Sequence, residues 1–265
     1  TTDQYQVVVQ KSGQVNVVFA NGEPVFTNVV PTVLLAGDDE EARPLGLHSE
    51  DAERTTVSDP LGQGQGFLFV GEKGEWHLRT YPGKPFLTVK MVYRNTGKKP
   101  VRVARLSPWS VGVARKSACI LGPQAAQTLV LDNGSLFRDF NDYAKVTRGG
   151  AERAGWNIAA HNPVSGRSLI AGFLTHGRAW TEFSLSRGEK AAENAFDRLS
   201  CDCVYDPPLE VAPDGELASE TLYIAVAETN PVTGLDRFGR AAAAVSGGPD
   251  APAFIPHGWD PWSAK

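Results

Sequence analysis

Short runs of strand-forming residues, interrupted by turn signals, constrain the fold of this 265-residue chain more than any other feature. Val, Phe, Tyr, Trp and Thr fit a pleated, half-buried surface, and they concentrate in runs such as QVNVVF, GEWHLRTY, PFLTVKMVYRN, RAWTEFSLS and TLYIAVAE. Between the runs, NGEP, YPGK, NTGKKP, DNGS and PDGE supply the Gly, Pro, Asn and Asp residues that turns require. Strands this numerous, without long helices alternating with them, favour stacked antiparallel sheets over a parallel α/β sheet.

The run PFLTVKMVYRN indicates how one such strand packs. Period-two alternation places four apolar residues on a single face, Leu87, Val89, Met91 and Tyr93. Helical spacing occurs only in two short segments, EKAAENAFDRL at 189–199 and NPVTGLDRFGRAAAAV at 230–245. The sequence therefore predicts an all-β fold with one or two short helices.

Composition and charge argue against several classes of protein. Hydrophobic residues make up 42% and charged residues 21%, as in ordinary globular domains. The formal net charge of -4, without a cluster of Lys and Arg, disfavours a nucleic-acid partner. No apolar run approaches the roughly 18 residues that a membrane-spanning helix needs. The opening TTDQ carries no charged-then-apolar leader, and a secreted or periplasmic location stays open.

Three cysteines, at positions 119, 201 and 203, give an odd count that argues against a disulfide framework. Cys201 and Cys203 in SCDC lie too far apart along a strand to bond without strain. We interpret them as reduced thiols, with half of a metal site as the alternative, since two ligands are half a zinc site and no His lies nearby.

Motifs that carry chemistry are scarce. The best carboxylate pair for sugar hydrolysis is Asp139 and Asp142. The flanking aromatic residues could form a platform on which a sugar stacks, and they are Phe137, Phe140 and Tyr143. The alternative is a surface turn with its aromatic rings pointing inward. The histidines have no metal-site spacing, and they are His48, His77, His161, His176 and His257. There is no GxSxG motif, and GQGQG at 62–66 lacks the spacing of a phosphate loop. The sequence thus predicts no cofactor and no metal.

Six tryptophans divide into two groups. Trp76, Trp109, Trp156 and Trp180 lie in or beside strand patterns, where large rings fill the space between sheets, so we expect all four in the core. The other two lie in the terminal stretch IPHGWDPWSAK, after the Gly- and Pro-rich linker SGGPDAPAF. Exposed indoles cost free energy in water, so this stretch either folds back onto the body or belongs to a further element.

The terminal GWDPW resembles the pattern that opens the catalytic (β/α)8 barrel in the alpha-galactosidase and raffinose-synthase group of glycoside hydrolases. The preceding SETLYIAVAETNPVTGLDRFGRAAAA is similar to the end of the N-terminal β-domain in that group. Three upstream segments are similar in kind to the strands of that domain, namely VYRNTGKKPVRVARLSPWSVG, LVLDNGSLFRDF and GRSLIAGFLTHGRAWTEFSLS.

This resemblance implies a two-sheet antiparallel supersandwich, galactose-mutarotase-like, over residues 1–245. Residues 246–265 would then be a linker and the start of a catalytic barrel that this chain lacks. Trp259, Asp260 and Trp262 match the barrel motif, and in the family such residues help to line the sugar subsite. The family's catalytic aspartates lie on later barrel strands, so no catalytic residue is carried over.

The leading hypothesis is therefore a non-catalytic β-sandwich domain of a carbohydrate-active enzyme, with a barrel domain and carbohydrate as partners. Two alternatives stay open. One is a free-standing, lectin-like sandwich that binds sugars on exposed Trp and Tyr rings. The other is a complete small sugar-active enzyme, such as an epimerase or lyase, for which His161, His176 and Glu182 are the residues to inspect. A homo-oligomer is compatible with each of the three.

Overall fold

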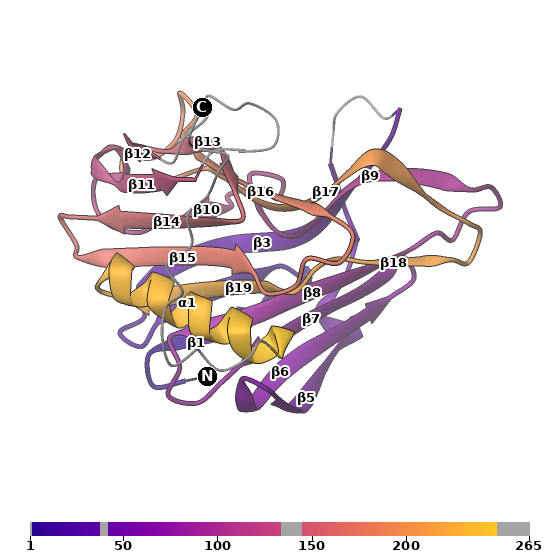
Figure 1. Cartoon of the computed structure of the whole chain (residues 1–265), viewed down its shortest axis with the longest axis horizontal. Coiled ribbons are helices and arrows are strands. Elements are labelled where there is room, and N and C mark those ends of the chain that lie inside the picture. Colours follow the sequence, from indigo (N-terminus) through magenta and orange to yellow (C-terminus); the bar gives the residue numbers. More distant parts are fainter. Residues whose placement is uncertain (1, 38–41, 134–144, 248–265) are drawn as a thin grey trace, which may run out of the picture.

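The computed structural model describes residues 2–37, 42–133 and 145–247, and within these ranges a pair of antiparallel sheets packs face to face (Figure 1). One α-helix lies across the outer face of the second sheet. The predicted all-β, two-sheet sandwich is confirmed. Within the described residues, no helix combines the length and apolar character needed to cross a membrane.

The first sheet places strands from both halves of the chain side by side. In spatial order its strands are β1 (Tyr5–Val9), β2 (Val15–Phe19), β3 (Pro24–Leu35), β9 (Val101–Val111), β17 (Arg198–Val211), β16 (Trp180–Ser186) and β13 (Ala151–Gly155). Two short strands, β4 (Arg43–Pro44) and β10 (Ala118–Cys119), also pair with β3.

The second sheet has a longer path. Its order is β12 (Lys145–Arg148), β11 (Leu129–Asp132), β14 (Asn157–Asn162), β15 (Arg167–Phe173), β19 (Leu222–Glu228), β8 (Phe86–Arg94), β7 (Gly74–Thr80), β6 (Gly62–Gly71) and β5 (Ala52–Asp59), with β18 (Glu216–Ala218) on β8. The remaining elements are two 3-10 turns, η1 (Ser49–Asp51) and η2 (Ala125–Gln127), and the helix α1 (Pro231–Ser246).

The main hydrophobic core fills the space between the two sheets. Trp76 of β7 and Trp109 of β9 are fully buried, with ring centroids 6.2 Å apart. The Trp76 indole N–H donates to the carbonyl of Pro108 at 2.9 Å, which joins the sheets through a buried hydrogen bond. The predicted apolar face of β8 is confirmed, because its alternate residues from Leu87 to Tyr93 all lie in this core.

A second apolar layer lies between the second sheet and α1. The ring centroids of Phe86 and Tyr223 in the sheet lie 4.5 Å apart, and Phe238 of the helix contacts Tyr223. The helix begins where the Asn230 side chain accepts from two backbone N–H groups, and it ends at Gly247, whose φ of 63° is left-handed. The helix predicted at 230–245 is confirmed.

The helix predicted at 189–199 is wrong. This segment forms turns, and its last two residues begin β17. The reason is tertiary: Phe196 is fully buried and exchanges two backbone hydrogen bonds of 2.9 Å with Cys119 of β10. That pairing outweighs the helical propensity of EKAAENAFDRL.

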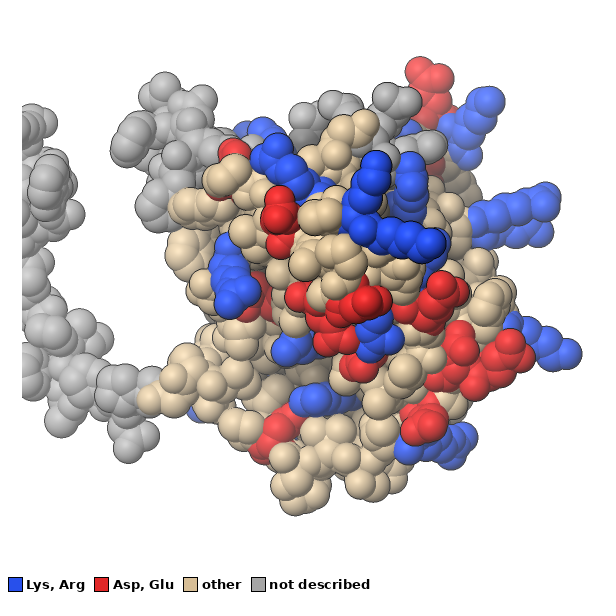
Figure 2. Space-filling model, turned by 90° about the vertical axis from the view of Figure 1, so that its right-hand side faces the viewer, with Lys and Arg blue, Asp and Glu red and all other residues tan. Residues whose placement is uncertain are grey.

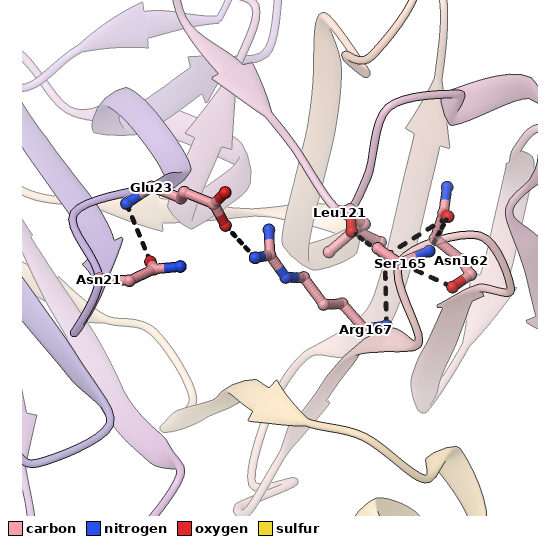
Figure 3. Close-up of polar contacts among 6 residues, drawn as sticks. All are labelled: Asn21, Glu23, Leu121, Asn162, Ser165 and Arg167. Carbon is pink, nitrogen blue, oxygen red and sulfur yellow. Dashed lines mark hydrogen bonds and ion pairs between the residues drawn. The ribbon is translucent and has the colours of Figure 1, made fainter.

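Polar contacts hold the turns of the two sheets together at one end of the sandwich (Figure 3). Arg167, at the start of β15, forms an ion pair with Glu23 next to the β2–β3 turn, and its guanidinium lies 4.3 Å from the Phe19 ring centroid. Nearby, the buried Asn162 accepts from the backbone N–H of Ser165, whose hydroxyl donates to the carbonyl of Leu121.

The end of the sandwich that carries β9 and β17 shows acidic and basic side chains interspersed (Figure 2).

Candidate functional site

The outer face of the first sheet carries polar and charged side chains where its inner face is apolar. Along β17, Leu199, Cys201 and Cys203 point into the core, so the residues between them point outward. Asp202 of β17 is paired in register with Glu182 of β16, and Trp180 is paired with Val204. We call this surface the polar face and define it by Arg105, Arg153, Trp156, Trp180, Glu182 and Asp202.

Asp202 is the buried centre of the polar face, with an exposed fraction of 5%. Its carboxylate accepts from the Ser107 hydroxyl at 2.6 Å and from the Ser200 hydroxyl, and Arg105 Nη1 lies 3.4 Å away. Burial raises the pKa of this carboxyl, and the Arg105 charge and the two serine hydrogen bonds only partly offset it. A carboxyl with a raised pKa, partnered by hydroxyls, can hold or release a proton closer to neutral pH.

Four neighbouring strands of the polar face each contribute one charged residue to a row. Glu182 lies opposite Asp202, and Arg153 Nε of β13 is 3.9 Å from Glu182 Oε2. With Arg105 on β9, the row reads positive, negative, negative, positive. The Glu182 charge is one of the causes that raise the pKa of Asp202.

Two tryptophans adjoin this row and are half-exposed, at 48% for Trp156 and 50% for Trp180. Trp156 follows the last residue of β13, and its backbone N–H donates to the carbonyl of Thr181 at 3.3 Å, which places Trp156 beside β16, the strand that carries Trp180. The His176 ring lies 5.3 Å from the Trp156 ring. The predicted core positions of Trp76 and Trp109 are confirmed, and those of Trp156 and Trp180 are wrong.

Strand phase and backbone geometry explain the exposed pair. In RAWTEFSLS, Trp180 is in phase with Glu182, whereas Phe183 and Leu185 occupy the inward phase. Trp156 has a φ of 65°, a left-handed conformation that is uncommon for a non-glycine residue and that ends the strand. The exposure of Trp180 could be predicted from the alternation of residues along its strand. The exposure of Trp156 depends on its left-handed backbone conformation, which the sequence does not show.

The loop that carries His176 is anchored by the side chain of Glu220. Its carboxylate accepts from the Thr175 hydroxyl at 2.6 Å and from the backbone N–H groups of Gly177 and Arg178 at 2.7 and 2.9 Å. Burial raises the pKa of Glu220, but these hydrogen bonds outweigh it and hold the pKa below its usual value. The ionised carboxylate therefore positions the loop beside Trp156.

The residues predicted from sequence fall into three groups. The first group lies outside the described residues and includes the predicted sugar-subsite residues Trp259, Asp260 and Trp262. It also includes residues 248–265 of the predicted linker and barrel start, and the carboxylate pair Asp139 and Asp142. His176 and Glu182 both lie next to the end of β13, at the polar face. His161 belongs to β14 of the other sheet, where its Nδ1 is 2.9 Å from the Ser168 hydroxyl.

The cysteines belong to the hydrophobic core and not to the polar face. Cys119, Cys201 and Cys203 are fully buried thiols, and burial raises the pKa of each. Within the described ranges, no group of three or more His, Cys, Asp or Glu residues is arranged to hold a metal ion.

The chemistry of the polar face suits a ligand with both apolar and hydroxyl-bearing sides. An indole offers a flat apolar surface, and its N–H group is a donor at the ring edge. The neighbouring carboxylates accept hydrogen bonds from hydroxyl groups, and the guanidinium groups donate them.

No protein-family model and no curated protein matches the sequence. Solved structures share its fold at low sequence identity. One is an alpha-galactosidase from Lactobacillus brevis, which has a TM-score of 0.51 and a sequence identity of 12%. The match covers 88% of this chain and 40% of the alpha-galactosidase chain. Another is a TPR-domain containing protein from Parabacteroides distasonis ATCC 8503, with a TM-score of 0.50, 10% identity, 86% of this chain covered and 46% of that chain. The chain thus has a β-sandwich fold found within an alpha-galactosidase and spans less than half the length of both proteins.

Proposed function

We propose that this chain is the β-sandwich domain of a carbohydrate-active enzyme and that its polar face binds carbohydrate. The observation that carries the proposal is a pair of half-exposed indoles near the Glu182 carboxylate: Trp156 directly follows β13, and Trp180 lies on the adjacent strand β16. Stacking of indoles on the apolar face of a sugar, with carboxylates accepting from its hydroxyls, uses both properties of this surface.

The proposed domain has no catalytic role of its own and supports a catalytic barrel. Two independent observations support this role: the sandwich fold shared with a longer alpha-galactosidase, and the GWDPW sequence that resembles the start of a barrel. In this proposal Trp259, Asp260 and Trp262 line a sugar subsite together with the barrel.

Isothermal titration with a panel of neutral oligosaccharides, including raffinose and galactobiose, tests the binding role. We expect saturable binding that Trp180→Ala weakens, because the variant removes one stacking surface. Val164→Ala is the matched control, since Val164 is 56% exposed on the β14–β15 turn, away from the polar face. No binding across the panel, or equal binding by both variants, would contradict the proposal.

Assay of the pure chain on aryl alpha-galactosides tests the non-catalytic role separately. We expect no turnover. Robust hydrolysis by the chain alone would overturn the proposed supporting role while leaving the binding result intact.

One observation favours a second candidate, an epimerase or lyase acting on a sugar. Asp202, whose pKa is raised, faces Glu182 in register, and two carboxyls in different environments can divide the roles of acid and base. This candidate predicts that the chain alone converts a free sugar and that Glu182→Gln abolishes the conversion. Proton NMR of a reducing-sugar panel would detect the change.

A further inference from the structure

A cleft of about 350 Å³ opens between the two sheets at the edge of the sandwich, far along both sheet orders from the polar face. Edge strand β1 of the first sheet contributes Val7 to one wall. The opposite wall is the inner face of β5, β6 and β7, which form the lower right margin of the second sheet in Figure 1. The cleft volume falls at the lower end of the range for small-molecule sites.

Strand register arranges one wall residue from each of three strands into a row. Arg54 of β5 pairs with Phe67 of β6, which pairs with Leu78 of β7. The neighbouring row on the same face includes Phe69 and Trp76, both fully buried in the core. The cleft is therefore the point where the hydrophobic core gives way to polar side chains at the mouth of the sandwich.

The next row outward is polar. Thr56 pairs with Gln65, and Gln65 pairs with Thr80. The Thr80 hydroxyl donates to the backbone carbonyl of Gln65 at 3.1 Å, so its oxygen keeps acceptor capacity. Among the described residues, the side chains of Thr56 and Gln65 form no hydrogen bond with another protein group, so their donors and acceptors are available to a ligand in the cleft.

Arg54 supplies a positive charge to this cleft. Its guanidinium carbon lies 6.0 Å from the Phe67 ring centroid, at the outer limit of a cation–π contact. No carboxylate in the described ranges pairs with it, whereas the neighbouring Arg79 is paired with Asp59. Stacking uses the flat face of the guanidinium and leaves its in-plane N–H groups for bidentate bonds to a carboxylate.

We propose that this cleft binds an acidic sugar, a uronate, with its carboxylate on Arg54. The Thr56, Gln65 and Thr80 row then contacts the ring hydroxyls, and the half-buried Phe67 covers the apolar face of the ring, with Leu78 beneath it in the core. A single guanidinium with a row of hydroxyl and amide groups suits one carboxylate on a polyhydroxylated body better than it suits a phosphate, which collects several cationic or backbone donors. This site is separate from the polar face and does not depend on the function proposed there.

Titration of the ¹⁵N-labelled chain with sodium D-glucuronate and D-galacturonate, followed by amide chemical shifts, tests the proposal. Neutral D-glucose and D-galactose at equal ionic strength are the comparison ligands. We expect saturable shifts at Gln65, Phe67 and Thr80 with at least one uronate and affinity at least about tenfold weaker for its neutral counterpart, because the charged hydrogen bonds are lost. Arg54 is exposed, so Arg54→Gln should fold normally and lose the same factor of about ten.

Arg102→Gln, an exposed arginine of β9, is the matched control and should bind like the parent chain. Trp180→Ala should leave the uronate-induced shifts at Gln65, Phe67 and Thr80 unchanged, which separates this cleft from the polar face. Equal affinity for acidic and neutral sugars, parent-like binding by Arg54→Gln, or no shift with either uronate would overturn the proposal. Inorganic phosphate that binds as tightly as the uronate at the same amides would overturn it as well, since the site would then recognise only an anion.

Discussion

Asp202 and Glu182 face one another in register across β17 and β16, on the outer side of a sheet whose inner side is the hydrophobic core. Like charges directly opposite one another destabilise a sheet. Here Arg105 approaches Asp202 and Arg153 approaches Glu182, so each carboxylate has a cationic neighbour. A fold that needed only an apolar core has no requirement for this row of charges, and we therefore place the function of the domain there.

The raised pKa of Asp202 predicts a pH dependence of stability. The unfolded chain ionises this carboxyl near pH 4, whereas the folded chain does so at higher pH. Between these two values the folded state binds more protons, so this group makes the free energy of unfolding fall as pH rises. Asp202→Asn removes that contribution, and the stability of the variant relative to the parent should increase from pH 4 upward.

Urea unfolding at a series of pH values measures this difference. Asp236→Asn, on the exposed side of α1, is the control for the loss of one carboxylate charge. A relative stability of Asp202→Asn that stays constant with pH, or that decreases as pH rises, would show that the carboxyl is ionised at least as easily in the folded as in the unfolded chain.

Loss of the hydrogen bond between Trp76 and Pro108 should lower the free energy of unfolding by more than the loss of buried apolar area alone. Trp76→Phe keeps an aromatic ring in the core but leaves the Pro108 carbonyl without its donor. We expect a loss of about 1–3 kcal/mol in the free energy of unfolding, from the unpaired buried carbonyl, with a further loss from the smaller ring. Trp180→Phe, at a half-exposed position, should change stability by less than about 0.5 kcal/mol.

The contact between α1 and the second sheet depends on Gly172. A Cβ atom at this position would lie 2.4 Å from the Phe238 ring, so Gly172→Ala should destabilise the chain by about 1–3 kcal/mol through overpacking. Phe238→Leu in the same chain should recover some of this loss, because the smaller side chain leaves room. Gly239→Ala, where the added Cβ meets nothing within 4 Å, should instead stabilise by about 0.5–1 kcal/mol. Thermal unfolding of these three variants and the parent chain would contradict this packing if Gly172→Ala were neutral.

The anchoring of the His176 loop predicts a local change in dynamics. Glu220→Gln replaces a carboxylate that accepts from Thr175, Gly177 and Arg178 with an amide that accepts less strongly. Amide hydrogen exchange at Gly177 and Arg178 should become faster, whereas exchange in the core strand β19 should change little. Unchanged exchange at these two amides would show that the loop is held by other contacts.

Much of the fold was predictable because local signals and tertiary structure agree. The alternation of β8 from Leu87 to Tyr93 specifies which face is buried, and Asn230 with Pro231 specifies where α1 begins. The helix prediction at 189–199 was wrong because Phe196 is buried against β10. This contact is with Cys119, which lies so far earlier in the chain that no local stretch of sequence includes both residues.

The candidate site was only partly predictable. The sequence indicates Glu182 and His176 as residues to inspect, but Asp202 lies on another strand, and only the strand register brings it opposite Glu182. Residue type predicts a core position for Trp180, because aromatic residues in strands are usually buried, whereas its phase relative to Phe183 indicates the outer face. Charged residues in phase with an aromatic one are therefore a better guide to a sheet surface than residue type.

The central claim is that carbohydrate binds the polar face through its two exposed indoles. The most direct test follows the side-chain indole N–H signals of the ¹⁵N-labelled chain during titration with the tightest neutral oligosaccharide of the panel. Our account predicts saturable shifts of the Trp156 and Trp180 signals while those of the buried Trp76 and Trp109 stay in place. Binding that leaves Trp156 and Trp180 unshifted would contradict it.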